Sequence, residues 1–251
     1  MPATPAWPPR SAPRLFVETQ LSAGTPVQIE GNQAHYLGKV MRVGAGDTVI
    51  LCDDSTGEWT AEVVKTAKRH IILAPKDHLR PREDVPDFWL CPALLKKDRF
   101  DLVLEKATEL GVDRIHPVLT RRCVADKLNP ARAQTIVTEA AEQCARTALP
   151  KVGVPQALDA LLNAWPAERS LFFADELGGK PAADAFRSGG TPAGLLIGPE
   201  GGFTDEERAK IRAHPAACPI TLGPRILRGE TAAISGTAIW MAECGDWQPE
   251  E

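Results

Sequence analysis

The chain has 251 residues, of which 43% are hydrophobic and 25% are charged, and its formal net charge is −4. This length exceeds a typical single domain of roughly 100 to 150 residues, which favours two domains. The composition is that of an ordinary globular protein, and no apolar run approaches the roughly 20 residues that a membrane helix needs. We therefore expect no membrane span.

Six cysteines are scattered without a CxxC pair or a histidine at metal-ligand spacing, so we expect reduced thiols, a cytoplasmic location and no metal. The charge is uneven along the chain. Residues 1–86 carry ten Lys/Arg and ten Asp/Glu, residues 87–151 eleven and nine, and residues 152–251 eight and fourteen. Because phosphate contacts need only local positive clusters, the acidic total neither supports nor excludes RNA.

The first third of the chain is typical of a small β domain. Residues 1–13 are rich in Pro and Ala without an apolar core, which predicts a disordered lead and no secretory signal. Close strand spacing with little helix favours a β-barrel over residues 14–80. Segments rich in β-branched and aromatic residues predict strands at 14–19, 48–53, 59–66 and 70–75, and one helix is expected at 34–42 after Asn32.

After a linker-like stretch at 79–87, apolar strands alternate with helical patterns. This alternation predicts parallel strands covered by helices, an α/β domain over residues 81–251. The predicted strands are DFWLCPALL, RIHPVL, SLFFAD, AGLLIG and PITLG, and the predicted helices begin near Asp98, Pro130, Lys180, Thr204 and Glu230. The helical periodicity is clearest at Phe100, Val103, Leu104, Ala107 and Leu110.

The segment LLIGPEGGFTDEE, residues 195–207, leads an apolar strand into a glycine-bearing turn. Thr204 and Glu207 after the turn form a predicted capping box that begins a helix. Such a turn at the end of a parallel strand favours a ligand site, because glycines let backbone amides approach closely. The segment matches neither GxGxxG nor a P-loop, which disfavours dinucleotides and triphosphates. The alternative is a tight turn whose glycines only meet backbone geometry.

A second segment, ITLGPRILRGETAAISGTAIW at 220–240, repeats the order of strand, glycine turn and helix. Two such turns on successive strands would bring backbone amides and carbonyls to one sheet edge, as an uncharged adenine ring and a ribose require. Arg225, Arg228 and Glu230 cluster there beside Thr231. These charges either serve the site or only decorate the surface.

These two segments together resemble the RsmE family of ribosomal RNA uridine N3-methyltransferases, a branch of the SPOUT superfamily. The segments KKDRFDLVLEKATELGVDRIHPVLTRRCV, EAAEQCART, RLFV and HYLGKVMRVGAGD also match. The resemblance implies a PUA-like β-barrel that helps to hold RNA, an α/β SPOUT domain with a deep trefoil knot, and a homodimer. It implies S-adenosylmethionine as cofactor and methylation of a specific uridine at N3 in 16S ribosomal RNA of the small subunit.

The resemblance also places the methyl-donor pocket. Its expected residues are Ile197, Gly198, Pro199, Glu200, Gly201, Gly202, Leu222, Gly223, Ile226, Leu227 and Thr231, with a looser match at Phe173 and Glu176. Arg228 is the first candidate for stabilising the uracil anion, because a guanidinium stays charged and can bond a base carbonyl. Glu230 or Glu200 could accept the N3 proton, or Glu230 could only orient the turn at Arg228.

Candidate RNA contacts are basic residues in the matched segments. They are His35, Arg42, Lys96, Lys97, Arg121, Arg122 and Arg146. Two other functions remain open: a methyltransferase of the same superfamily acting on transfer RNA or a ribose 2′-hydroxyl, and a non-catalytic ribosome-assembly factor that binds RNA. The intact glycine turns argue against the second.

Overall fold

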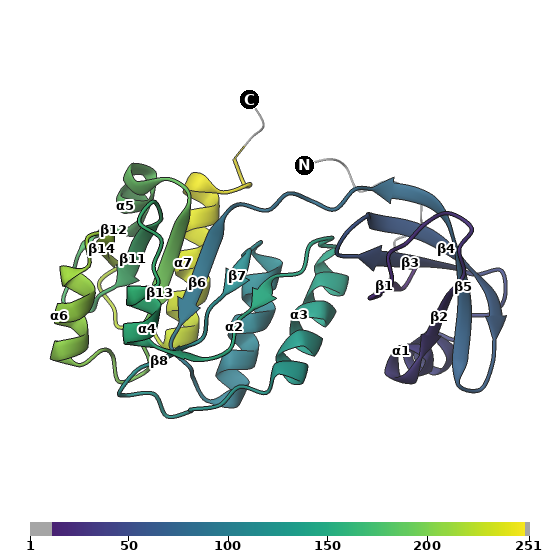
Figure 1. Cartoon of the computed structure of the whole chain (residues 1–251), viewed down its shortest axis with the longest axis horizontal. Helices are drawn as coiled ribbons and strands as arrows, with labels where there is room; N and C mark the ends of the chain where they lie inside the picture. Colours follow the sequence, from purple (N-terminus) through teal and green to yellow (C-terminus); the bar gives the residue numbers. More distant parts are fainter. Residues whose placement is uncertain (1–11, 249–251) are drawn as a thin grey trace. The chain divides into compact units, whose positions relative to one another are not determined.

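The computed structural model describes residues 12–248, and the expected disordered lead therefore lies almost wholly outside the described residues (Figure 1). The chain forms two compact units. The first contains the chain up to Asp84 together with residues 141–148, and the second contains residues 85–140 and the chain from Leu149 onward. Buried apolar residues form a core within each unit.

The first unit is built on a five-stranded sheet in the order β1-β3-β4-β5-β2. Its strands are β1 (Arg14–Phe16), β2 (Val27–Glu30), β3 (Thr48–Asp53), β4 (Gly57–Thr66) and β5 (His70–Arg80). β1 pairs in parallel with β3, and the other pairs are antiparallel. In β2, Val27 and Ile29 are buried while Gln28 and Glu30 are exposed, the alternation expected of a strand with one face on the core.

The helix expected at 34–42 begins earlier and changes its winding. The α-helix α1 (Gly31–His35) continues as a π-helical turn, η1 (Tyr36–Val40), in which the Met41 amide donates to the Tyr36 carbonyl at 2.9 Å. The N-cap is Glu30 and not Asn32, so that part of the prediction is wrong. The winding keeps Leu37 fully buried against the sheet.

The second unit is built on seven parallel strands in the order β12-β14-β11-β13-β6-β7-β9. These strands are β6 (Phe88–Pro92), β7 (Arg114–Ile115), β9 (Lys151–Val152), β11 (Ser170–Ala174), β12 (Lys180–Pro181), β13 (Ala193–Ile197) and β14 (Ala217–Thr221). A separate parallel pair joins β8 (Val118–Leu119) to β10 (Gln156–Ala157). The predicted α/β layer of parallel strands is therefore confirmed.

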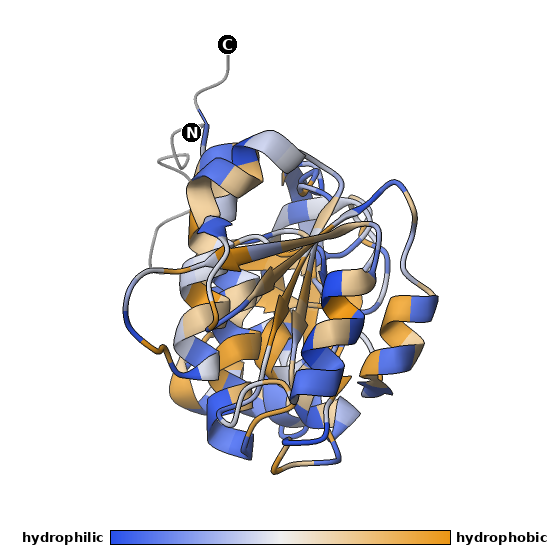
Figure 2. Cartoon of the chain, turned by 90° about the vertical axis from the view of Figure 1, so that its left-hand side faces the viewer, coloured by the Kyte–Doolittle hydropathy of each residue, from blue (hydrophilic) through white to orange (hydrophobic). Residues whose placement is uncertain are grey.

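Helices cover both faces of this sheet, and the strands are hydrophobic in the middle of the unit (Figure 2). The helices are α2 (Lys97–Glu109), α3 (Pro130–Cys144), α4 (Leu158–Asn163), α5 (Ala182–Gly189), α6 (Asp205–Ala213) and α7 (Gly229–Cys244). Phe172 and Leu195 pack on the face that carries α2, α5 and α7. Phe173 and Leu196, one residue further along their strands, pack on the face that carries α4 and α6.

Two predicted local signals are confirmed. Phe100, Val103, Leu104 and Ala107 are buried on one face of α2. Thr204 caps α6 and forms the full capping box with Glu207, in which the Glu207 amide donates to the threonine hydroxyl at 3.2 Å. The chain therefore enters α6 with a fixed geometry directly after the first glycine-bearing turn.

Candidate methyl-donor site

A cavity of about 300 Å³ opens at the carboxyl ends of three neighbouring parallel strands, β11, β13 and β14. Parallel neighbours end at the same sheet edge, so the turns that follow them meet there. The cavity is lined by Ala174, Asp175, Glu176, residues 197–202, residues 220–227, Gly229 and Ala232. Both glycine-bearing turns of the sequence thus line one cavity.

The first turn is restricted to glycine by its neighbours. Gly202 has a φ of +66°, and a Cβ atom there would lie 2.7 Å from Oε1 of Glu176. A Cβ at Gly198 would lie 3.1 Å from the Phe203 ring. The turn can therefore follow the cavity wall closely only because these positions carry no side chain.

An ion-pair network fixes the turn that follows β11, whose residues Asp175 and Glu176 line the cavity. The buried Asp175 carboxylate accepts from Nε of Arg208 at 3.2 Å and from Nη2 of Arg212 at 2.6 Å, and both arginines belong to α6. Arg208 also pairs with Glu176. Glu176 is partly exposed at the cavity, so its carboxylate retains capacity to accept hydrogen bonds from a ligand.

The second turn gives the cavity an apolar side. Ile197, Leu222 and Leu227 line it, and Gly223 adopts a φ of +114° in the bend between the last two. Ile226 also lines the cavity but is 92% exposed. Thr231, in contrast, is exposed on α7 and is not among the lining residues.

Phe173 departs from the expectation that it faces the methyl donor. Side chains alternate across a strand, and Phe173 is fully buried with α4 and α6, whereas its neighbour Ala174 lines the cavity. We therefore no longer count Phe173 among the cofactor contacts.

Arg99 on α2 joins two acidic residues beside the cavity, a role that sequence analysis missed. Its Nη1 donates to Oε1 of Glu230 at 3.1 Å, and its Nε lies 3.9 Å from Oε1 of Glu200. Glu230 is only 8% exposed, whereas Glu200 is exposed and lines the cavity. The available signal was the matched KKDRF segment, which contains this arginine.

Arg228 is the N-cap residue of α7 and is exposed. It does not itself line the cavity, but its neighbours Leu227 and Gly229 do. Among the described residues it has no ion-pair partner, so its guanidinium is available for a substrate.

The expected RNA contacts divide into exposed and buried residues. Arg146 is only 5% exposed and lies 3.7 Å from Glu83, so it has no surface for a phosphate, and we withdraw it. Arg122 donates to the Gly201 carbonyl at 2.7 Å, which supports the first glycine turn. The others are exposed: His35, Arg42, Lys96, Lys97 and Arg121.

Segments of both units match known protein families. Residues 29–76 match the RNA methyltransferase PUA domain, and residues 82–241 match the RNA methyltransferase domain. The ribosomal RNA small subunit methyltransferase E of Synechocystis sp. is 32% identical, with 87% of this chain and 74% of that protein covered. The corresponding enzyme of Rickettsia conorii is 27% identical, with 90% and 93% covered.

Solved structures give the same result. The crystal structure of a ribosomal RNA small subunit methyltransferase E from Neisseria gonorrhoeae bound to S-adenosyl methionine is 28% identical, with a TM-score of 0.86 and 94% of this chain and 100% of that chain covered. No helix within residues 12–248 is long and apolar enough to cross a membrane. Within the same range, no group of three or more His, Cys, Asp or Glu side chains could hold a metal ion.

Proposed function

Because the chain belongs to the ribosomal RNA small subunit methyltransferase E family, we propose that it transfers a methyl group from S-adenosylmethionine to N3 of a specific uridine in 16S ribosomal RNA. The observation that carries the proposal is the convergence of the two glycine-bearing turns on one cavity. The bound S-adenosyl methionine of the Neisseria gonorrhoeae relative adds support, since this chain covers the whole of that protein.

The residues of the cavity suit an adenosyl ligand. Ile197, Leu222 and Leu227 offer apolar surface for the adenine ring, and the glycine turns let backbone groups approach it. Glu176, held by Arg208, offers an oxygen to ribose hydroxyls. S-adenosylmethionine, when bound, supplies the electrophilic methyl group.

The protein's own task is to make uracil N3 reactive. N3 carries a proton at neutral pH, so methylation needs a proton acceptor and stabilisation of the developing anion. In this proposal the free guanidinium of Arg228 bonds a base carbonyl. Glu230 is buried and paired with Arg99, which favours a role in orienting the turn at Arg228 over accepting a proton. Glu200, exposed at the cavity, is then the proton acceptor, directly or through one water.

The proposal includes a homodimer in the cytoplasm and a trefoil knot in the second unit. All three rest on the family resemblance.

The test is a methyl-transfer assay on naked 16S ribosomal RNA and on assembled small subunits, with Arg228→Ala and the exposed control Arg187→Ala. We expect Arg228→Ala to lower kcat by about 100-fold or more, as for loss of one stabilising donor, with unchanged binding of S-adenosylmethionine. The control keeps wild-type kcat. Wild-type turnover in Arg228→Ala would remove this arginine from the mechanism.

Mass mapping of the product tests the site of methylation. N3-methyluridine is expected. A methylated ribose or a transfer RNA product would favour the related enzymes, and absence of S-adenosylmethionine binding by folded protein would favour a non-catalytic assembly factor.

A further inference from the structure

The segment that follows β8 is folded into a tight turn, which we call the supporting turn and define by Thr120, Arg121, Arg122 and Cys123. The Cys123 amide donates to the Thr120 carbonyl at 3.2 Å, and the Cys123 side chain packs against the core of the second unit. Because the turn is closed by this bond and anchored at its last residue, the two arginines within it lie at defined positions.

Arg122 connects the supporting turn to the first glycine-bearing turn. Its Nη1 donates to the Gly201 carbonyl at 2.7 Å and to the Phe203 carbonyl at 3.3 Å. A Cβ built at Gly201 would lie 3.3 Å from Cδ of Arg122, so the aliphatic part of the arginine also packs on this turn. Gly201 lines the methyl-donor cavity and Arg122 does not. The arginine therefore holds the cavity wall from outside the cavity.

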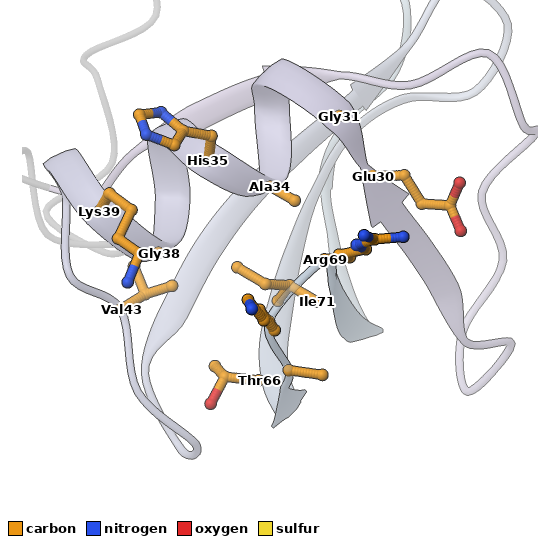
Figure 3. Close-up of a pocket in the computed structure, with 12 residues that line it drawn as sticks. Glu30, Gly31, Ala34, His35, Gly38, Lys39, Val43, Thr66, Arg69 and Ile71 are labelled. Atoms are coloured by element: carbon orange, nitrogen blue, oxygen red, sulfur yellow. The ribbon is translucent and has the colours of Figure 1, made fainter.

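Arg122 differs in this respect from exposed cations of the first unit. Lys39 and Arg69 line a hollow of about 940 Å³, and neither has an ion pair or a side-chain hydrogen bond within residues 12–248 (Figure 3). Arg122 also lacks an ion pair in that range, but two backbone carbonyls hold its guanidinium. Its position is therefore set by the glycine-bearing turn and not by a carboxylate.

A buried carboxylate makes a second connection to the supporting turn. Glu207 on α6 is only 7% exposed, and its Oε1 accepts from the Arg121 amide at 2.8 Å. Its Oε2 accepts from the Thr204 amide at 2.9 Å, directly after the first glycine-bearing turn. The chain from Gly201 to Thr204 is thus fixed to the supporting turn at both ends, through Arg122 at one and Glu207 at the other.

We propose that Arg122 is a positioning residue for the methyl donor, which acts by holding the first glycine-bearing turn in the shape that binds S-adenosylmethionine. Glycines give a turn more backbone freedom than other residues do, and affinity is lowered by the entropy that is lost when such a segment becomes ordered on binding. Hydrogen bonds from a charged guanidinium reduce this loss, because they order the turn before the ligand arrives. The inference rests on the proposed function, and it replaces the expectation that Arg122 contacts RNA.

The test is calorimetric titration of the full chain with S-adenosylmethionine in the absence of RNA. Arg122→Ala should raise Kd about tenfold, since it removes a charge-assisted hydrogen bond to the turn. Arg122→Lys should give an intermediate Kd, because an ammonium group can still donate to the Gly201 carbonyl. The matched control is Arg121→Ala, which removes a neighbouring charge that pairs with the exposed Glu206 and keeps the amide that bonds Glu207. Its Kd should equal that of wild type.

A second pair of variants tests the connection through Glu207. Glu207→Ala and Thr204→Ala each remove one half of the capping box, but only Glu207→Ala also breaks the bond to the Arg121 amide. We expect Kd for S-adenosylmethionine to rise at least about threefold in Glu207→Ala and to stay at the wild-type value in Thr204→Ala. Thermal unfolding shows whether each variant remains folded.

Methyl-transfer kinetics separate this role from an RNA contact. In Arg122→Ala, KM for S-adenosylmethionine should rise by a factor similar to that for Kd, while KM for RNA and the rate at saturating S-adenosylmethionine stay within about twofold of wild type. Three results would overturn the inference: a wild-type Kd in Arg122→Ala, an equal loss of affinity in Arg121→Ala, and a raised KM for RNA with unchanged Kd. If the wild type binds S-adenosylmethionine and transfers methyl groups, these results reject the role of Arg122 only. A folded wild-type protein that does not bind S-adenosylmethionine would reject the proposed function as well.

Discussion

Gly202 is subject to two separate constraints, and they can be tested apart. Its φ of +66° disfavours any side chain, and an added Cβ would also lie 2.7 Å from Glu176. We expect Gly202→Ala to lower the free energy of unfolding by about 1–2 kcal/mol through the backbone, and to weaken S-adenosylmethionine binding about tenfold by displacing Glu176. Chemical unfolding and calorimetry measure the two effects.

The matched control is Gly24→Ala in the first unit. Gly24 has a similar φ of +74°, but nothing lies within 4 Å of a Cβ built there. It should lose a similar free energy of unfolding and keep wild-type cofactor affinity. Equal affinities in the two variants would show that contact with Glu176 does not shape the site.

Individual residues mark where sequence reasoning succeeded. The glycine turns could be placed at one cavity because strand, turn and helix are local patterns, and Ile197, Leu222 and Leu227 line it as expected. The orientation of Phe173 and the burial of Arg146 could not be predicted, because both depend on partners distant in the sequence. The same distance hid Arg99, which is 131 residues from its partner.

At the scale of elements, α6 depends on its capping box. Thr204 accepts from the Glu207 amide, and the Glu207 carboxylate accepts from the Thr204 amide at 2.9 Å. We expect Thr204→Ala to cost about 1 kcal/mol of unfolding free energy, and Thr204→Ser to restore most of it because the hydroxyl returns. Denaturant unfolding measures both, and equal losses in the two variants would contradict a hydroxyl cap.

The strands show which elements can be predicted from a local sequence pattern and which cannot. The predicted strand at 48–53 coincides with β3, because its apolar and β-branched run is long and bounded by turns. The predicted strand at 114–119 is divided into β7 and β8 around Pro117, which lacks the amide needed to continue a ladder. The polar alternation of β2 was missed because four residues give too weak a signal.

At the scale of the whole molecule, the expected PUA-like domain followed by a SPOUT α/β domain is confirmed. The order of the seven strands could not be derived from the sequence, because neighbours such as β6 and β13 are about 100 residues apart. Nor could any local pattern place residues 141–148 with the first unit, since they end a helix that begins in the second.

Each unit buries one cysteine completely, and the Cys52 thiol gives the first unit a measurable alkaline sensitivity. Burial raises the pKa of Cys52 from 9.0 to about 12. In the unfolded chain the thiol ionises near pH 9, whereas in the folded chain it stays protonated up to about pH 12. The stability that this difference gives the folded state is complete below pH 9 and is lost as the pH rises toward 12. Between pH 9.5 and 10.5, wild type should lose about 1.2 kcal/mol more unfolding free energy than Cys52→Ala. Val49→Ala, which removes buried volume from the same strand without a titrating group, should keep the wild-type slope, and parallel profiles for wild type and Cys52→Ala would contradict a protonated native thiol.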